Sequence, residues 1–174
     1  MNHKSLRFII LSLALLMSYP SFSAVNSVNH LSQKELMQRL NITFTADSLD
    51  NGWLDNNDLS EVERQMTLIG IQSACNGNAT VNADKKITSL DSSLKEYTEN
   101  VYKFRKENPA TWRGTTQFTS TTVADAHVLV VDKTDPVTGN RVLIVFSDGD
   151  TTVPVHGVGG IDVDAWRPEF VKIK

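Results

Sequence analysis

The chain has 174 residues, with 17 Lys and Arg against 20 Asp and Glu, giving a net charge of −3 at neutral pH. This length suits one domain that buries its own core. An acidic chain without a basic cluster is a poor ligand for nucleic acids or anionic lipids, so we expect neither as a partner.

Residues 1–24 have the three parts of a cleavable secretory signal of the bacterial type. Its apolar run, residues 8–17, has ten residues, whereas a helix that crosses a bilayer needs about twenty. We therefore expect cleavage after Ser23 or Ala24 and no stable membrane insertion. The signal carries two basic and no acidic residues, so its removal leaves residues 25–174 as one periplasmic or secreted domain of net charge −5.

Capping signals followed by apolar residues at helical spacing predict three helices. The first begins at Ser32 with Glu35 as its capping partner, and the β-branched residues after Leu40 predict its end there. The second begins at Asp58, with Glu61 as its capping partner. The third begins near residue 88 or 89 and stops at Asn108-Pro109. The apolar stripes of the last two helices are Leu59, Val62, Met66 and Ile69, and Leu90, Leu94, Tyr97, Val101 and Phe104.

A β-hairpin is the clearest tertiary signal in the second half. The β-branched runs 126–131 and 141–146 flank a segment rich in turn residues. Both runs are apolar on both faces, whereas a strand with one wet face alternates. Either further structure covers both sides, or one side is a partner surface.

Shorter patterns complete the predicted sheet. We expect strands at residues 114–122, 151–155 and 170–173, with Pro154 marking an edge and the glycines at 157, 159 and 160 forming a loop. The predicted class is α+β, with residues 25–109 mainly helical and residues 110–174 an antiparallel sheet built on the 126–146 hairpin.

Residues 47–58 carry Asp and Asn at spaced positions around Gly52, a pattern that resembles an EF-hand calcium loop. The ligands that this resemblance implies are Asp47, Asn51, Asp55 and Asp58. The loop departs from the family at its third position, where Leu49 supplies no side-chain ligand. It departs again at its last position, where Asp58 replaces the usual glutamate.

Residues 80–91 resemble a second, degenerate EF-hand loop. Thr80 stands at the first position, where the family has Asp, and Lys85 stands at the sixth, where it has Gly. Leu54 and Ile87 lie 33 residues apart, near the spacing of paired hands. The resemblance implies that these two residues face each other in a short antiparallel bridge, and it implies calcium as the one possible cofactor.

Two further groups of residues have reactive side chains. A late cluster of Asp148, Asp150, His156, Asp162 and Asp164, with His127 on the hairpin, would bind a metal or act in acid–base chemistry if its members converge. Aspartates that only form turns would give the same sequence pattern without forming a metal or catalytic site. The single cysteine, Cys75, lies in an apolar context that favours a buried small side chain over a reactive thiol or an intermolecular disulfide.

The sequence thus supports three functions. The first is a non-enzymatic module that recognises another envelope or secreted protein through a sheet edge, such as the Thr-rich segment 115–122, or through an apolar sheet face. The second is a calcium-binding module built on the EF-hand-like loops. The third is a small hydrolase that uses the late Asp and His cluster, although the chain lacks the G-x-S-x-G elbow of many hydrolases.

The calcium hypothesis makes a direct prediction for the exported chain. Calorimetry with calcium chloride should record binding heat, and calcium should raise the melting temperature, because a ligand that binds only the folded state stabilises it. A titration without heat and an unchanged melting temperature would together refute calcium binding.

Overall fold

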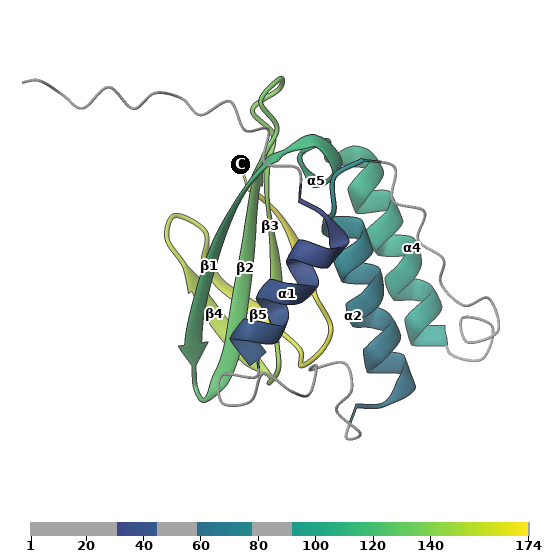
Figure 1. Cartoon of the computed structure of the whole chain (residues 1–174), viewed down its shortest axis with the longest axis vertical. Coiled ribbons are helices and arrows are strands. Elements are labelled where there is room, and N and C mark those ends of the chain that lie inside the picture. The colour runs from purple at the N-terminus through teal and green to yellow at the C-terminus, as the bar shows by residue number, and fades with distance from the viewer. Residues whose placement is uncertain (1–30, 45–58, 78–91, 174) are drawn as a thin grey trace, which may run out of the picture.

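The computed structural model describes residues 31–44, 59–77 and 92–173, and it has the predicted α+β class (Figure 1). The helices are α1 (Gln33–Phe44), α2 (Glu61–Ala74), α4 (Ser92–Glu107) and the short α5 (Ala110–Arg113). The strands are β1 (Thr115–Val123), β2 (Ala126–Thr134), β3 (Arg141–Ser147), β4 (Thr151–Val155), β5 (Gly159–Val163) and β6 (Glu169–Ile173). No helix in these three ranges is both long and apolar enough to span a membrane.

Four strands form one antiparallel sheet in the order β1-β2-β3-β6, and β4 and β5 form a separate antiparallel hairpin. The predicted central hairpin is confirmed, since β2 pairs with β3 from Val128 opposite Ser147 to Thr134 opposite Arg141. The strands predicted at either end of the β half are confirmed as the two edges, β1 beside β2 and β6 beside β3.

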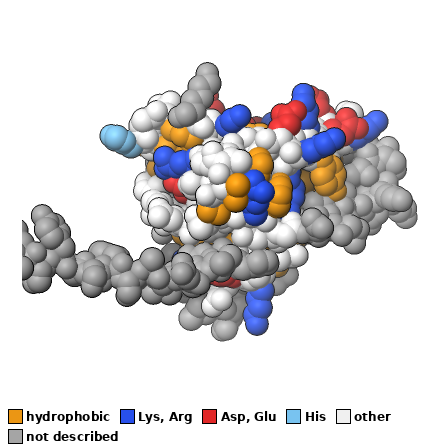
Figure 2. Space-filling model, turned by 90° about the horizontal axis from the view of Figure 1, so that it is seen from above, with side chains coloured by type: hydrophobic (Ala, Val, Ile, Leu, Met, Phe, Trp, Pro, Cys, Tyr) orange, Lys and Arg blue, Asp and Glu red, His pale blue; other side chains and the backbone are white. Residues whose placement is uncertain are grey.

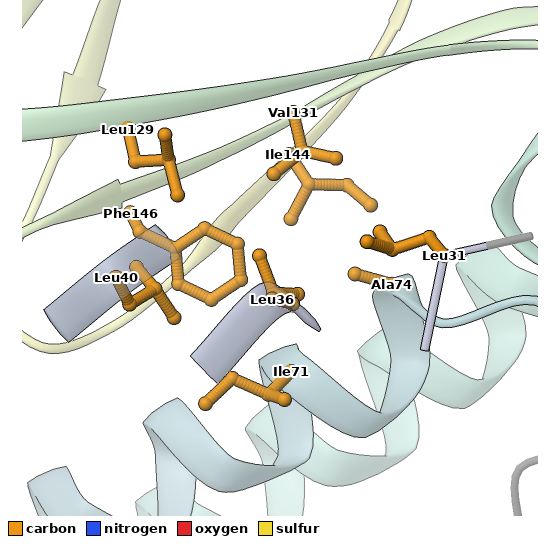
Figure 3. Close-up of a cluster of buried hydrophobic side chains, with 9 residues drawn as sticks. All are labelled: Leu31, Leu36, Leu40, Ile71, Ala74, Leu129, Val131, Ile144 and Phe146. Atoms are coloured by element: carbon orange, nitrogen blue, oxygen red, sulfur yellow. The ribbon is translucent and has the colours of Figure 1, made fainter. Parts of the chain in front are cut away.

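The central hairpin is apolar on both faces because both faces are covered. In Figure 1 α1 lies in front of the sheet with α2 beside it, and β4 and β5 lie behind the sheet. The helix-side core consists of Leu31, Leu36, Leu40, Ile71, Ala74, Leu129, Val131, Ile144 and Phe146 (Figure 3). The hairpin-side core consists of Val128, Leu143, Val145, Val153, Ile161 and Val163. Of the two arrangements that the sequence left open, coverage of both sides is the one observed.

The first helix runs one turn further than predicted. Ser32 caps it as expected, because the Ser32 Oγ accepts a hydrogen bond from the amide of Glu35 at 3.2 Å. The helix ends at Phe44 rather than near Leu40, so the prediction from β-branched residues was wrong. The Phe44 ring packs edge-on against Trp166, with ring centroids 5.4 Å apart, and this tertiary contact outweighs the local preference.

Two other predicted boundaries were also wrong. The cap of α2 is Ser60 rather than Asp58, with a complete capping box between Ser60 and Glu63. Gly159 and Gly160 begin β5 instead of lying in a loop, because β5 pairs with β4 from Val155 opposite Gly159 onward. The third helix ends at Glu107, before the Asn108-Pro109 stop as predicted, while its predicted start lies outside the described residues.

A third buried cluster lies between α2 and α4 and consists of Met66, Ile69, Leu94, Tyr97 and Val101. It extends to the segment before β6. A Cβ atom added at Gly70 would lie 2.5 Å from the Pro168 ring, so this α2 position needs glycine for the close approach. On the other side, the Tyr97 hydroxyl donates a hydrogen bond of 2.8 Å to the Pro168 carbonyl. Pro168 is therefore fixed between the two helices.

A buried lysine connects the sheet to the end of α2. Lys133 of β2 has no exposed surface, and its ammonium donates to the carbonyls of Ala74 at 2.5 Å and Thr111 at 2.6 Å. Its third donor reaches the side-chain oxygen of Asn76 at 2.6 Å. Three acceptors match the three N–H groups of an ammonium. A cation also suits the negative end of a helix dipole.

Arg105 of α4 reinforces this end of α2 from the other side. Its guanidinium donates to the carbonyls of Ser73, Cys75 and Gly77, the Cys75 contact being 3.1 Å. These carbonyls lie in and after the last turn of α2, where a helix leaves acceptors without partners. Two cations from different elements therefore satisfy one helix end.

The described part of the face seen from above is mixed in charge. In the view of Figure 2, Lys and Arg side chains lie beside Asp and Glu side chains, with small hydrophobic patches between them. This face therefore carries no extended field of one sign.

Replacing Lys133 should lower the free energy of unfolding, because its ammonium anchors β2 to the end of α2. Lys133→Met removes three buried hydrogen bonds, so we expect a loss of roughly 2–4 kcal/mol in the free energy of unfolding. Lys172→Met, at an exposed lysine of β6, should change it by less than about 0.5 kcal/mol. Urea titration followed by circular dichroism measures both.

The Lys133 anchor should also be sensitive to pH. Burial lowers the pKa of Lys133 from 10.5 to about 7. The unfolded chain then binds one proton more than the folded chain between pH 7 and about 10.4, so stability rises with pH across this window. The stability difference between wild type and Lys133→Met should therefore widen from pH 7 to pH 10. A constant difference over that range would contradict this explanation.

The turn between β1 and β2 offers a stabilising change. Its two loop residues, Ala124 and Asp125, have φ of 49° and 69°, as in a type I′ turn, which favours Asn followed by Gly. The double change Ala124→Asn, Asp125→Gly should raise the free energy of unfolding by about 1 kcal/mol. Val137→Asn, at an exposed loop residue without positive φ, is the control. A destabilised double variant would show that this turn is not of the expected type.

Candidate binding site at the edge strand β1

The strand β1 lies at one edge of the sheet. Among the described residues it pairs only with β2, over all nine of its positions from Thr115 to Val123. It contains no proline and no charged residue, and only Thr116 is buried. Natural sheets usually protect their edges with charges, prolines or bulges, because an open edge invites pairing with another strand.

The other strand edges in the described part of the chain carry such protection. The edge strand β6 has Glu169 at its start and an exposed lysine, Lys172, near its end. The small hairpin has Pro154 in β4 and two glycines at the start of β5. The edge of β1 is therefore the long, regular and uncharged one.

The register shows which backbone groups of β1 face outward. Val123 and Ala126 flank a two-residue loop, and residues in that position form a hydrogen-bonded pair. Every second residue from Val123 toward the start of the strand therefore bonds to β2. The N–H and C=O groups that face away from the sheet belong to Thr116, Phe118, Ser120 and Thr122.

Helix α1 lies over one face of this edge and forms a pocket with it. Six residues line the pocket, which has a volume of about 270 Å³: Ile42, Thr43, Ser120, Thr121, Thr122 and His127. Ile42 is 58% exposed and Thr43 follows it, so the helical wall of the pocket belongs to the turn of α1 that sequence reasoning missed. Further along the strand, the Arg39 guanidinium lies 4.0 Å from the centre of the Phe118 ring.

His127 is the titratable side chain of this pocket, and Asp148 holds it in place. The Asp148 carboxylate accepts from the His127 amide at 2.6 Å and lies 2.7 Å from the ring Nδ1. A carboxylate at Nδ1 favours a proton on that nitrogen and fixes the orientation of the ring. In the described part of the chain no hydroxyl is hydrogen-bonded to this ring. Asp148 therefore orients the imidazole, but in the described part of the chain no nucleophilic side chain is hydrogen-bonded to it.

The three aspartates of the late cluster other than Asp148 make contacts elsewhere, and His156 is exposed in the turn between β4 and β5. Asp150 accepts from the amide of Ala165, Asp162 from the hydroxyl of Thr152, and Asp164 forms an ion pair with Arg167 at 3.0 Å. Within the described ranges, no group of three or more His, Cys, Asp or Glu side chains is arranged to hold a metal ion. The structure thus brings together His127 and Asp148, while these three aspartates make local contacts.

The EF-hand-like loops lie outside the described residues. This applies to the four implied ligands, Asp47, Asn51, Asp55 and Asp58, and to the expected bridge between Leu54 and Ile87. Calcium binding at residues 47–58 and 80–91 stays a prediction.

Cys75 matches the favoured interpretation of a buried small side chain. It is 5% exposed, and its thiol donates to the Ile71 carbonyl at 3.1 Å. Burial raises the pKa of Cys75 to about 11, which keeps the thiol protonated and a poor nucleophile at neutral pH.

Sequence reasoning did not assign Ile42 and Thr43 to a site, because it ended the helix before them. It did identify the Thr-rich segment 115–122 as a strand for addition, and β1 spans that segment. Comparisons with protein-family models, curated proteins and solved structures found no match to this chain.

Proposed function

We propose that this protein is an exported, non-enzymatic interaction protein that binds an extended segment of another envelope or secreted protein along β1. The observation that carries the proposal is the edge itself, which is nine residues long, uncharged and paired on one side only among the described residues. Strand addition to such an edge uses backbone hydrogen bonds for affinity and side-chain pockets for specificity.

The coverage of the sheet favours the edge over a face. Both faces of the β2–β3 hairpin are packed, one against α1 and α2 and the other against β4 and β5. An apolar sheet face was one of the two surfaces considered from the sequence. Because the residues that made it attractive are buried in this chain's own core, the edge is the surface that we propose.

The pocket beside β1 gives the proposed interaction its specificity. An added strand would pair with the outward groups of Phe118, Ser120 and Thr122, and its alternate side chains would point toward α1. There they would meet Ile42 and the imidazole of His127. We therefore expect the pocket to select a side chain with both an apolar part and a polar group that can hydrogen-bond the imidazole.

A proline at Ser120 tests the proposal. Ser120→Pro removes one outward N–H but no hydrogen bond to β2, so the fold should tolerate it, as edge strands tolerate proline on their open side. We expect it to reduce partner retention at least tenfold, whereas Ser120→Ala, which keeps the N–H, should retain the partner. The measurement is affinity capture from envelope and secreted fractions, quantified by mass spectrometry, with melting temperatures to verify folding.

Two outcomes would contradict the proposal. One is a partner that a folded Ser120→Pro variant retains as well as wild type does, because binding would then not use this edge. The other is that wild type retains no partner from either fraction.

A further inference from the structure

A second pocket lies between α4 and the start of β6, away from the β1 edge. Its volume is about 150 Å³, below the 300–1,000 Å³ of typical small-molecule sites and near the size of one side chain. The lining residues that matter here are Tyr97, Asn100 and Phe104 of α4 with Arg167, Glu169 and Phe170. Pro168, fixed between Gly70 and the Tyr97 hydroxyl, holds the second wall against the first.

Glu169 is the unusual residue of this pocket. It is half-buried, and within the described residues its carboxylate makes no hydrogen bond and no ion pair, unlike the buried carboxylate of Asp135, which Arg113 holds at 2.8 Å. Burial raises the pKa of Glu169, which shows that its surroundings disfavour the charged form. A carboxylate removed from water without a partner carries a free-energy cost that a bound cation would relieve.

The net charge of the groups around Glu169 favours the binding of one cation. Arg167 at the pocket is already paired with Asp164, at 3.0 Å, so these two charges balance each other. Arg167 also attracts the Glu169 carboxylate, but two carboxylates share this one cation, so the group keeps one net negative charge. A single positive charge in the pocket would complete the balance.

The aromatic walls suit a cation as well. The Arg167 guanidinium already lies 5.7 Å from the centre of the Tyr97 ring. Phe104 and Phe170 form an edge contact, with ring centroids 5.6 Å apart. Aromatic rings attract cations through their quadrupole, and the attraction grows when the cation is desolvated.

We propose that this pocket binds the side chain of a lysine from a partner protein, with its ammonium at Glu169 and its methylene chain against the aromatic walls. An ammonium is compact enough for a volume of this size, and a lysine stem packs well on apolar surface while its charged end pairs. This inference goes beyond the proposed function and does not depend on it, because the pocket lies at the edge opposite β1.

Titrations followed by amide chemical shifts test the lysine site in the exported chain. The probes are lysine blocked at both ends (Nα-acetyl-lysine N-methylamide), the same compound acetylated at Nε, and n-butylammonium. The blocked lysine should shift the amides of residues 97–104 and 167–170, and the Nε-acetyl compound, which lacks the charge, should not. Glu169→Gln should weaken binding of the blocked lysine at least tenfold. Asp162→Asn, which removes an exposed carboxylate of β5, should leave it unchanged.

Several results would overturn this site. They are an absence of shifts with the blocked lysine, equal shifts with its Nε-acetyl form, or equal affinity in a Glu169→Gln variant whose spectrum shows an intact fold. Binding of n-butylammonium without binding of the blocked lysine would assign the pocket to free amines instead of a protein side chain. Because Ser120→Pro does not touch this pocket, it should bind the blocked lysine as wild type does, which separates this test from that of the β1 edge.

Discussion

The ammonium of Lys133 joins β2 to the last turn of α2 and to α5 through three hydrogen bonds of 2.5–2.6 Å. A lysine without exposed surface is costly unless all of its donors are satisfied, and here each donor has an acceptor. The interaction fixes where α2 ends against the sheet. Arg105 binds the neighbouring carbonyls from α4, so the helical layer and the sheet share one polar junction.

This junction decides which surfaces remain for binding. With α2 held against β2 and β3, α1 packs over the same face through Leu36 and Leu40, and the β4–β5 hairpin covers the other face. The large apolar surfaces are buried in the two cores on either side of the sheet. The surfaces that the described fold leaves outside include the edge of β1 and two small pockets beside the sheet, one near each edge. These are polar and partly apolar sites suited to extended chain or single side chains.

The sequence predicted the sheet better than the helix ends, for a physical reason. The strands 126–134 and 141–147 are local runs of β-branched residues joined by a turn, so their pairing follows from neighbouring sequence. The end of α1 depends on Trp166, far away in the chain, and local preference gave the wrong boundary. At α2, both Asp58 and Ser60 stand three residues before a glutamate, and capping patterns alone do not choose between them.

In the candidate sites, too, some features follow from local sequence and others depend on residues far apart in the chain. Alternation along β2 places Lys133 on the same face as Leu129 and Val131, so the pattern held a signal for a buried lysine, but its acceptors come from two other elements. The Thr-rich edge strand could be predicted, because the polarity and length of a strand follow from its own residues. The pairing of His127 with Asp148 continues the β2–β3 register one step beyond Val128 and Ser147, so the predicted hairpin held a signal for it. The surroundings of Glu169 come from α4 and the segment before β6, which the local sequence of β6 does not encode.

If β1 has an open edge, its outward amides are exposed to solvent, and amide hydrogen exchange measured by NMR on residues 25–174 reports this residue by residue. Amides that bond to β2 should be protected and outward amides should not. For an open edge we expect slow exchange at Thr119 and Thr121 and fast exchange at Ser120 and Thr122. Protection of Ser120 and Thr122 as strong as that of their neighbours would mean that this edge is already paired and does not offer a site for an added strand.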